Sequence, residues 1–160
     1  MMSSGKARRV MLRLAREWMG SRTKADTKVD DTSPFIDLGS GWGTLVVALA
    51  REYPDRHIIG YELSWFPWLV SSMRKYCLGL NNLSLYRKNF IDADLNNASI
   101  LFCYLFPGGM ASLYEKLKKD VSQEVCIISN TFALPSCPSS QTVKLDDIYR
   151  SPIYVYKWLG

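Results

Sequence analysis

The chain has 160 residues, which is long enough for one domain with a substantial hydrophobic core. Hydrophobic residues make up 48% of it, and no segment is long and apolar enough to predict a membrane span. The formal net charge at pH 7 is +5, but residues 1–28 carry all of this excess and the remainder is nearly neutral, which argues against a nucleic-acid-binding surface spread over the whole domain.

The basic N-terminal segment, residues 1–28, is predicted to be a helical arm. Apolar residues recur at helical spacing between Met11 and Trp18, which favours an amphipathic helix packed on the main domain, residues 29–160. Arg-rich amphipathic segments are also typical of mitochondrial targeting peptides, and basic helices can lie on membranes or acidic partners. The chain shows no apolar signal-peptide core, so we expect a cytoplasmic protein, with a mitochondrial location as the alternative.

Apolar runs of strand length alternate with helical patterns through most of the chain. Strands are predicted at 35–39, 57–63, 83–90, 100–106 and 125–132, and helices at 44–53, 67–79 and 110–121. The run Pro107-Gly108-Gly109 is expected to separate the fourth strand from the helix that follows. In the second helix an apolar face is expected to pack inward, with Arg74 and Lys75 outward; this face consists of Leu69, Val70, Met73, Tyr76 and Cys77.

This alternation predicts an α/β fold of the Rossmann-like, doubly wound type, with a mostly parallel sheet. Residues 133–141 are rich in Pro and Ser and are predicted to form a loop. The last two apolar runs, 142–148 and 152–158, are too close together for a crossover helix, so we expect them to form an antiparallel hairpin. Five parallel strands and this hairpin give a predicted sheet of seven strands.

The most informative segment is FIDLGSGWG (35–43), in which an apolar strand leads into Gly39, Gly41 and Gly43. Glycines at alternate positions allow a tight turn and the close approach of a ligand. The turn opens onto a helix N-terminus, which offers a ligand free N–H groups and a partial positive charge. The segment therefore predicts a site for a nucleotide-like cofactor.

The spacing of the glycines separates the cofactor classes. A dinucleotide site needs G-x-G-x-x-G, and its third glycine would fall at the position of Thr44. A P-loop is excluded because no G-K-[S/T] follows the glycines. A cofactor with an amino-acid tail fits better. Asp37 would bind an α-ammonium group, the Gly39–Gly43 backbone would surround the tail, and Glu62 would hold a ribose.

By these residues and its order of elements, the chain resembles the class I, seven-stranded S-adenosylmethionine-dependent methyltransferases over about residues 30–158. FIDLGSGWG is similar to the first cofactor motif of that family, GYEL (60–63) to the second, and KNF (88–90) to the segment beside the adenine. The resemblance implies S-adenosylmethionine as cofactor and S-adenosylhomocysteine as product. The implied cofactor residues are Asp37, Gly39, Ser40, Gly41, Gly43, Glu62, Leu63, Asn89 and Phe90.

Three segments resemble more narrowly the small protein-lysine methyltransferases that modify mitochondrial carrier and ATP synthase subunits, and their bacterial relatives. These segments are GYELSWFPWLV (60–70), YLFPGGMASLYEKLKK (104–119) and ALPSCP (133–138). The first departs from that family's pattern by two additional residues before Pro67. The resemblance implies a protein partner as substrate, and it assigns no catalytic residue. The residues implied to line the acceptor site for lysine are Tyr104, Phe106 and Pro107.

Other acceptors remain open, because a fold does not determine its substrate. A small-molecule or RNA methyltransferase on the same fold is the main alternative, and the basic arm slightly favours RNA. A non-catalytic protein that only binds S-adenosylmethionine is a third interpretation. The segment after the fourth predicted strand lacks [Asp/Asn]-Pro-Pro-[Tyr/Phe], which argues against methylation of DNA adenine and of glutamine, so we expect no DNA partner.

No metal site is predicted, because none of the four cysteines lies in C-x-x-C spacing or near a histidine. Cys103 and Cys126 fall in apolar runs and are expected to be buried, reduced thiols. The one histidine, His57, stands at the start of the second predicted strand, far from the expected cofactor edge. The sequence does not indicate an oligomeric state.

Overall fold

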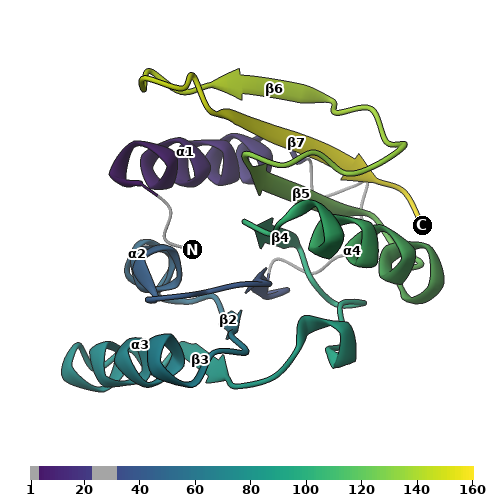
Figure 1. Ribbon diagram of the computed structural model, residues 1–160. Coiled ribbons are helices and arrows are strands. Elements are labelled where there is room, and N and C mark those ends of the chain that lie inside the picture. Colours follow the sequence, from purple (N-terminus) through teal and green to yellow (C-terminus); the bar gives the residue numbers. More distant parts are fainter. Residues whose placement is uncertain (1–3, 23–31) are drawn as a thin grey trace.

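The computed structural model of the protein describes residues 4–22 and 32–160 and shows one central sheet with helices on both faces (Figure 1). In chain order the strands are β1 (Phe35–Asp37), β2 (Ile58–Tyr61), β3 (Leu83–Tyr86), β4 (Ile100–Cys103), β5 (Val125–Asn130), β6 (Gln141–Lys144) and β7 (Pro152–Trp158). The helices are α1 (Gly5–Ser21), α2 (Thr44–Glu52), α3 (Trp65–Cys77) and α4 (Pro107–Asp120), with a short 3₁₀-helix η1 (Phe90–Asp92).

The sheet has seven strands in the order β3-β2-β1-β4-β5-β7-β6. The first five strands are parallel, whereas β7 runs antiparallel to both β5 and β6. The predicted seven-stranded Rossmann-like sheet with a C-terminal hairpin is therefore confirmed. The strand order reverses between β1 and β4, and in open sheets of this kind ligands bind beyond the carboxyl ends of the strands at such a point.

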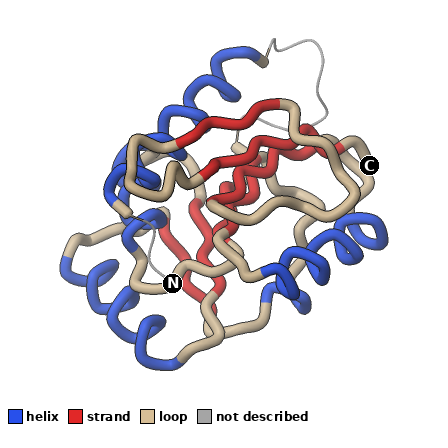
Figure 2. The backbone as a smooth tube through the Cα atoms, turned by 45° about the horizontal axis from the view of Figure 1, so that its top comes forward, coloured by secondary structure: helices blue, strands red, loops and turns tan. Residues whose placement is uncertain are grey.

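Two hydrophobic clusters fill the space between the sheet and the helices on its two faces. Figure 2 shows these helices on either side of the strands. Strand β4 contributes to both: Ile100 and Phe102 pack with α1 and α2, and Leu101 and Cys103 pack with α4. All four residues of β4 are buried, as expected for a central strand covered on both sides.

The helix α1 is part of this core. Its residues Met11, Leu14 and Ala15 are buried in the same cluster as the strands, and Arg16 forms an ion pair with Glu52 of α2 at 2.9 Å. The part of the predicted basic arm that the structure describes is thus a packed amphipathic helix. The predicted boundary between residues 28 and 29 lies outside the described residues.

The prediction of an inward apolar face for the second helix was wrong for Met73, Tyr76 and Cys77, which are exposed, whereas Leu69 and Val70 are half-buried. In α3 the fully buried residue is Ser71, while Met73 is 59% and Tyr76 88% exposed. The reason is the position of α2, whose N-terminal cap, Gly43, lies so close that a Cβ on it would come within 2.7 Å of Ser71 Cβ. Packing of α3 on α2 therefore selects a small residue, and Arg74 turns back to donate to the Trp42 carbonyl.

Several predicted strands were too long at their carboxyl ends. The strand predicted at 35–39 ends at Asp37, the one at 83–90 ends at Tyr86, and the one at 100–106 ends at Cys103. The Pro-Gly-Gly run predicted to separate elements instead forms the first turn of α4, where proline at the first position is favoured. The residues beyond these strand ends form the loops that bound the candidate site.

Candidate functional site

The glycine turn follows β1 directly. Gly41 and Gly43 have φ angles of 50° and 76°, in the left-handed region that favours glycine. Gly43 caps α2 and is held against Ser71, so its immediate role is backbone geometry and helix packing. Gly39 has an ordinary φ, and a Cβ there would touch the Leu105 side chain at 3.4 Å in the loop after β4. The turn thus lies between the loops of its two neighbouring strands.

Glu62 connects the end of β2 to this turn. One carboxylate oxygen accepts the Gly41 N–H at 2.8 Å, and the other accepts the Ser64 N–H at 2.7 Å. A carboxylate has about four lone-pair sites, so Glu62 retains acceptor capacity toward a ligand. The predicted ribose-binding residue is therefore already oriented by two backbone groups.

Asp37 is buried at the end of β1, with 5% of its surface exposed, and accepts the Gly39 N–H at 3.1 Å. Burial raises the pKa of Asp37 to about 7; the hydrogen bond from Gly39 opposes this rise, and the charge of Glu62 adds to it. Ser40 lines the same pocket as Asp37; its Oγ lies on the Gly60 side, is buried and has no hydrogen-bond partner among the residues that the structure describes. A buried carboxylate without a cationic partner in the described part of the chain fits a cationic ligand group.

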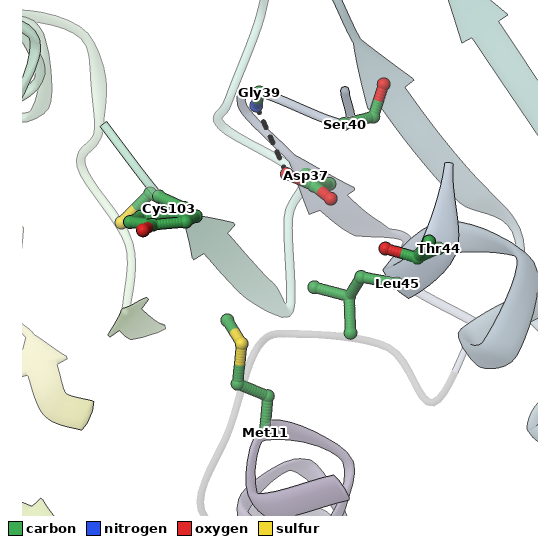
Figure 3. A pocket seen from close by; sticks show the side chains of 8 residues that line it. Met11, Asp37, Gly39, Ser40, Thr44, Leu45 and Cys103 are labelled. Carbon is green, nitrogen blue, oxygen red and sulfur yellow. Dashed lines mark hydrogen bonds between the residues drawn. The ribbon is translucent and has the colours of Figure 1, made fainter. Parts of the chain in front are cut away.

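These two residues line a small enclosed pocket below the glycine turn, shown in Figure 3. Met11 reaches it from α1, and Leu45 lies at the start of α2. The full lining consists of Met11, Asp37, Gly39, Ser40, Thr44, Leu45, Cys103 and Tyr104. The contribution of α1 was not predicted, because Met11 reaches the pocket only through long-range packing.

The segment after β3 is fixed by Asn89 and Lys116. Asn89 caps η1, since its side-chain oxygen accepts the Ile91 N–H at 3.1 Å. The Lys116 ammonium group reaches from α4 and donates to the Ile91 carbonyl at 2.7 Å, and it also pairs with Asp120 at 2.8 Å. Phe90 is packed against the core on the α4 side. Phe90 and the Ile91 carbonyl are thus held by α4, whereas Asn89 is held within its own segment by its bond to the Ile91 N–H.

A groove of about 320 Å³ joins these parts, within the range common for ligand sites. It is lined by Leu38, Gly39, Glu62, Leu63, Lys88, Asn89, Phe90, Tyr104, Leu105, Phe106 and Gly109. The groove brings together five of the predicted cofactor residues, Gly39, Glu62, Leu63, Asn89 and Phe90. Gly39 and Tyr104 also line the enclosed pocket, so the groove and the pocket that holds Asp37 and Ser40 adjoin. Gly41 and Gly43 line neither and act through the backbone of the turn.

The far side of the groove is aromatic. Tyr104 and Phe106, both predicted at the acceptor site, line it, whereas Pro107 begins α4 and is not among the lining residues. Phe132, from the segment after β5, stacks on Tyr104 with ring centroids 6.3 Å apart and contacts Phe106 at 6.0 Å. Phe132 was not predicted as a site residue, although an aromatic side chain just past the carboxyl end of β5 is a signal that could have found it.

Residues 4–22 and 32–160 contain no group of three or more His, Cys, Asp or Glu side chains that could hold a metal ion. Cys103 and Cys126 are buried free thiols, and burial raises the pKa of Cys103 to about 12. His57 directly precedes the first residue of β2, and its Nε2 atom lies 2.8 Å from Ser84 Oγ in β3. No described helix combines the length and the apolar character needed to cross a membrane.

Comparison with known proteins identifies the family. Residues 37–141 match the family model described as the ANTKMT methyltransferase domain. The chain is 20% identical over 122 residues to a protein-lysine N-methyltransferase of Saccharolobus islandicus, covering 75% of each protein. It is 30% identical over 106 residues to a lysine N-methyltransferase of Mus musculus that is named for an ATP synthase substrate, covering 64% of this chain and 41% of the mouse enzyme.

Among solved structures, an RNA methyltransferase from Salinibacter ruber in complex with S-adenosylhomocysteine shares the fold. The TM-score is 0.81 at 21% identity, and the match covers 100% of this chain and 95% of that one. The chain belongs to the ANTKMT methyltransferase domain family and is a class I methyltransferase that uses S-adenosylmethionine.

Proposed function

We propose that the protein methylates the side-chain amine of lysine residues in a protein substrate. The observation that carries the proposal is the position of Tyr104 and Phe106, which line the same groove as Glu62 and Asn89. Aromatic rings therefore stand directly beside the residues proposed to hold the cofactor. The Saccharolobus and mouse relatives, both named as lysine N-methyltransferases, support the same acceptor.

The cofactor residues predicted from the sequence are proposed to act at three places. Glu62 would accept the ribose hydroxyls with the capacity left by its bonds to the turn. Asp37, buried at the end of β1, would bind the α-ammonium group of the amino-acid tail. The adenine would lie between the residues at the ends of β2 and β3, namely Leu63, Asn89 and Phe90.

When bound, S-adenosylmethionine supplies an electrophilic methyl group. The chain itself has to align the acceptor amine and limit the access of water. Tyr104 and Phe106 would pack along the hydrocarbon stem of the lysine, and their ring faces attract the ammonium group. The amine has to be neutral to attack, and its pKa in water is about 10.4. Because Phe106 is 63% exposed, the mouth of the groove is open to solvent, where lysine Nζ can lose its proton before the neutral amine enters.

The test is methyl transfer from labelled S-adenosylmethionine to a cell lysate, followed by mass spectrometry. We expect a labelled protein that contains methyl-lysine. Phe106→Ala should lower the initial rate at least tenfold. Leu159→Ala is the matched control, because Leu159 is similarly exposed, at 67%, but follows the carboxyl end of the antiparallel strand β7 at the opposite edge of the sheet.

Three other results would each contradict the proposal. Label that is removed by ribonuclease would indicate an RNA acceptor, and label that passes through a dialysis membrane would indicate a small molecule. Binding of S-adenosylhomocysteine without any transfer would indicate a non-catalytic binding protein. The cytoplasmic location expected from the sequence, with a mitochondrial location as the alternative, stays a prediction, and cell fractionation is its test.

A further inference from the structure

The segment after β5 contains a strained residue beside the proposed acceptor site. Thr131 has a φ of 71°, a left-handed conformation that is unfavourable for a β-branched residue. Its N–H donates to the Pro152 carbonyl at 2.8 Å, and its hydroxyl donates to the Asn130 side-chain oxygen at 3.1 Å. Strained residues of this kind persist where the surrounding structure holds them, and they cluster at functional sites.

The turn at Thr131 also fixes the backbone of Phe132. The Phe132 N–H donates to the Asn130 carbonyl at 2.9 Å, and the buried Ser129 hydroxyl donates to the Phe132 carbonyl. Both backbone polar groups of Phe132 are thus bonded to residues at the end of β5. The chain is turned so that the Phe132 side chain points back toward the loop after β4.

The ring of Phe132 is shared by the two aromatic residues of the groove. It stacks on Tyr104 at an interplanar angle of 26° and contacts Phe106 at 48°. Phe132 is half-buried and is not among the residues that line the groove, so it stands behind the two rings that do. Phe106 is largely exposed, and its ring contact with Phe132 restricts its rotamers from the protein side.

We propose that Phe132, held by the strained turn at Thr131, is a positioning residue that orients Tyr104 and Phe106 for the lysine side chain. This inference rests on the proposed function of the same site. A turn that needed only a left-handed residue would be served by Gly or Asn, which adopt this conformation more readily. Threonine adds the hydroxyl bond to the Asn130 side chain, which ties the turn before Phe132 to the end of β5.

The test uses the peptide around the methyl-lysine that the lysate experiment identifies. For Phe132→Leu we expect the KM for this peptide to rise at least tenfold, while the Kd for S-adenosylhomocysteine changes by less than twofold. Phe132→Tyr keeps the ring and should restore the KM to within about threefold of wild type. A merely structural role for Phe132 would instead lower the Tm and weaken cofactor binding together.

Thr131→Gly separates strain from positioning. Glycine adopts the left-handed conformation without strain, so the Tm should stay equal or rise, whereas loss of the hydroxyl bond should raise the peptide KM. An unchanged KM in both Phe132→Leu and Thr131→Gly would overturn the inference even if the wild-type protein methylates lysine. If Phe132→Leu fails to fold, the peptide KM of Thr131→Gly alone tests the inference: a raised KM supports it and an unchanged KM overturns it. A wild-type protein that transfers no methyl group to lysine would refute the proposed function itself, and the inference with it.

Discussion

The Glu62 carboxylate accepts the Gly41 N–H at 2.8 Å and so joins the end of β2 to the glycine turn after β1. The same side chain also fixes its own loop through the Ser64 N–H. The ribose position and the shape of the turn around the amino-acid tail therefore depend on one residue. Loss of Glu62 should affect cofactor binding by more than the loss of two ribose hydrogen bonds.

We expect Glu62→Ala to weaken the binding of S-adenosylhomocysteine at least 100-fold. Hydrogen bonds to a charged group contribute about 1.5–3 kcal/mol each, so two of them account for a factor of this order. Glu62→Gln keeps one acceptor oxygen, so its affinity for S-adenosylhomocysteine should lie between those of Glu62→Ala and the wild-type protein. Isothermal titration calorimetry measures the affinity, with the exposed Glu115→Gln as control. Affinity near the wild-type value in Glu62→Ala would show that the ribose lies elsewhere.

Asp37 should make the stability of the ligand-free protein depend on pH. Its pKa is raised by burial from 3.8 to about 7, so between these values the folded state keeps a proton that the unfolded state has lost. The contribution of Asp37 to the free energy of unfolding must then fall as the pH rises from about 4 to about 7. The fall is on the order of 4 kcal/mol, since each pKa unit corresponds to about 1.4 kcal/mol.

Asp37→Asn provides the matched comparison, because Asn cannot ionise and retains an oxygen to accept the Gly39 N–H. Chemical denaturation at several pH values should show the difference in stability between wild type and variant changing across this window. A difference that stays constant from pH 4 to 7 would mean that Asp37 is ionised throughout.

Binding of a cationic group beside Asp37 should also release a proton. An ammonium group favours the ionised carboxylate, so the affinity for S-adenosylhomocysteine should rise with pH up to about 7. Calorimetry at pH 6 in two buffers with different ionisation enthalpies measures the proton release directly. Asp37→Asn should abolish this release and weaken binding. Equal apparent enthalpies in the two buffers for the wild-type protein would contradict the proposed position of the ammonium group.

The sequence predicted the parts of the site that depend on local pattern. The glycine turn, Asp37 before it and Glu62 after β2 follow from motif spacing and from the rule that parallel strands end at one edge. The prediction of the inward face of α3 failed because apolar periodicity does not reveal that Gly43 lies against Ser71. Met11 and Phe132 were not predicted as site residues for a related reason. Their positions at the site depend on packing between segments far apart in the chain.

Lys116→Met should loosen the segment that carries Asn89. Lys116 is buried, and its ammonium group donates to the Ile91 carbonyl at 2.7 Å, whereas Met fills a similar volume without a donor. A hydrogen bond from a charged group contributes about 1.5–3 kcal/mol, and the free energy of unfolding should fall by up to this amount because the bond is only partly buried. We expect the Kd for S-adenosylhomocysteine to rise severalfold as well, because η1 loses its hydrogen bond to α4. Lys119→Met, at an exposed position of the same helix, should change neither value. Unchanged cofactor affinity in Lys116→Met would show that η1 is fixed without this bond.

Gly43→Ala should destabilise the protein through two separable effects. The left-handed φ of 76° costs a non-glycine residue about 1–2 kcal/mol. The new Cβ would also lie 2.7 Å from Ser71 Cβ, and overpacking of this kind costs about 1–3 kcal/mol. Together these effects should lower the Tm by several degrees.

Substitution of Ser71 distinguishes the two effects. Ser71→Gly removes the opposing Cβ, so in the double variant it should recover the overpacking part of the loss but leave the backbone strain. Ser71→Ala keeps the Cβ, so in the double variant it should recover none of the stability lost in Gly43→Ala. A double-mutant cycle on the free energy of unfolding should therefore give a favourable coupling of about 1 kcal/mol or more for Gly43→Ala with Ser71→Gly, and close to zero with Ser71→Ala. Equal coupling in the two cycles would mean that α3 moves away from the glycine turn to accept the methyl group, and that the contact between Gly43 and Ser71 does not hold the turn in place.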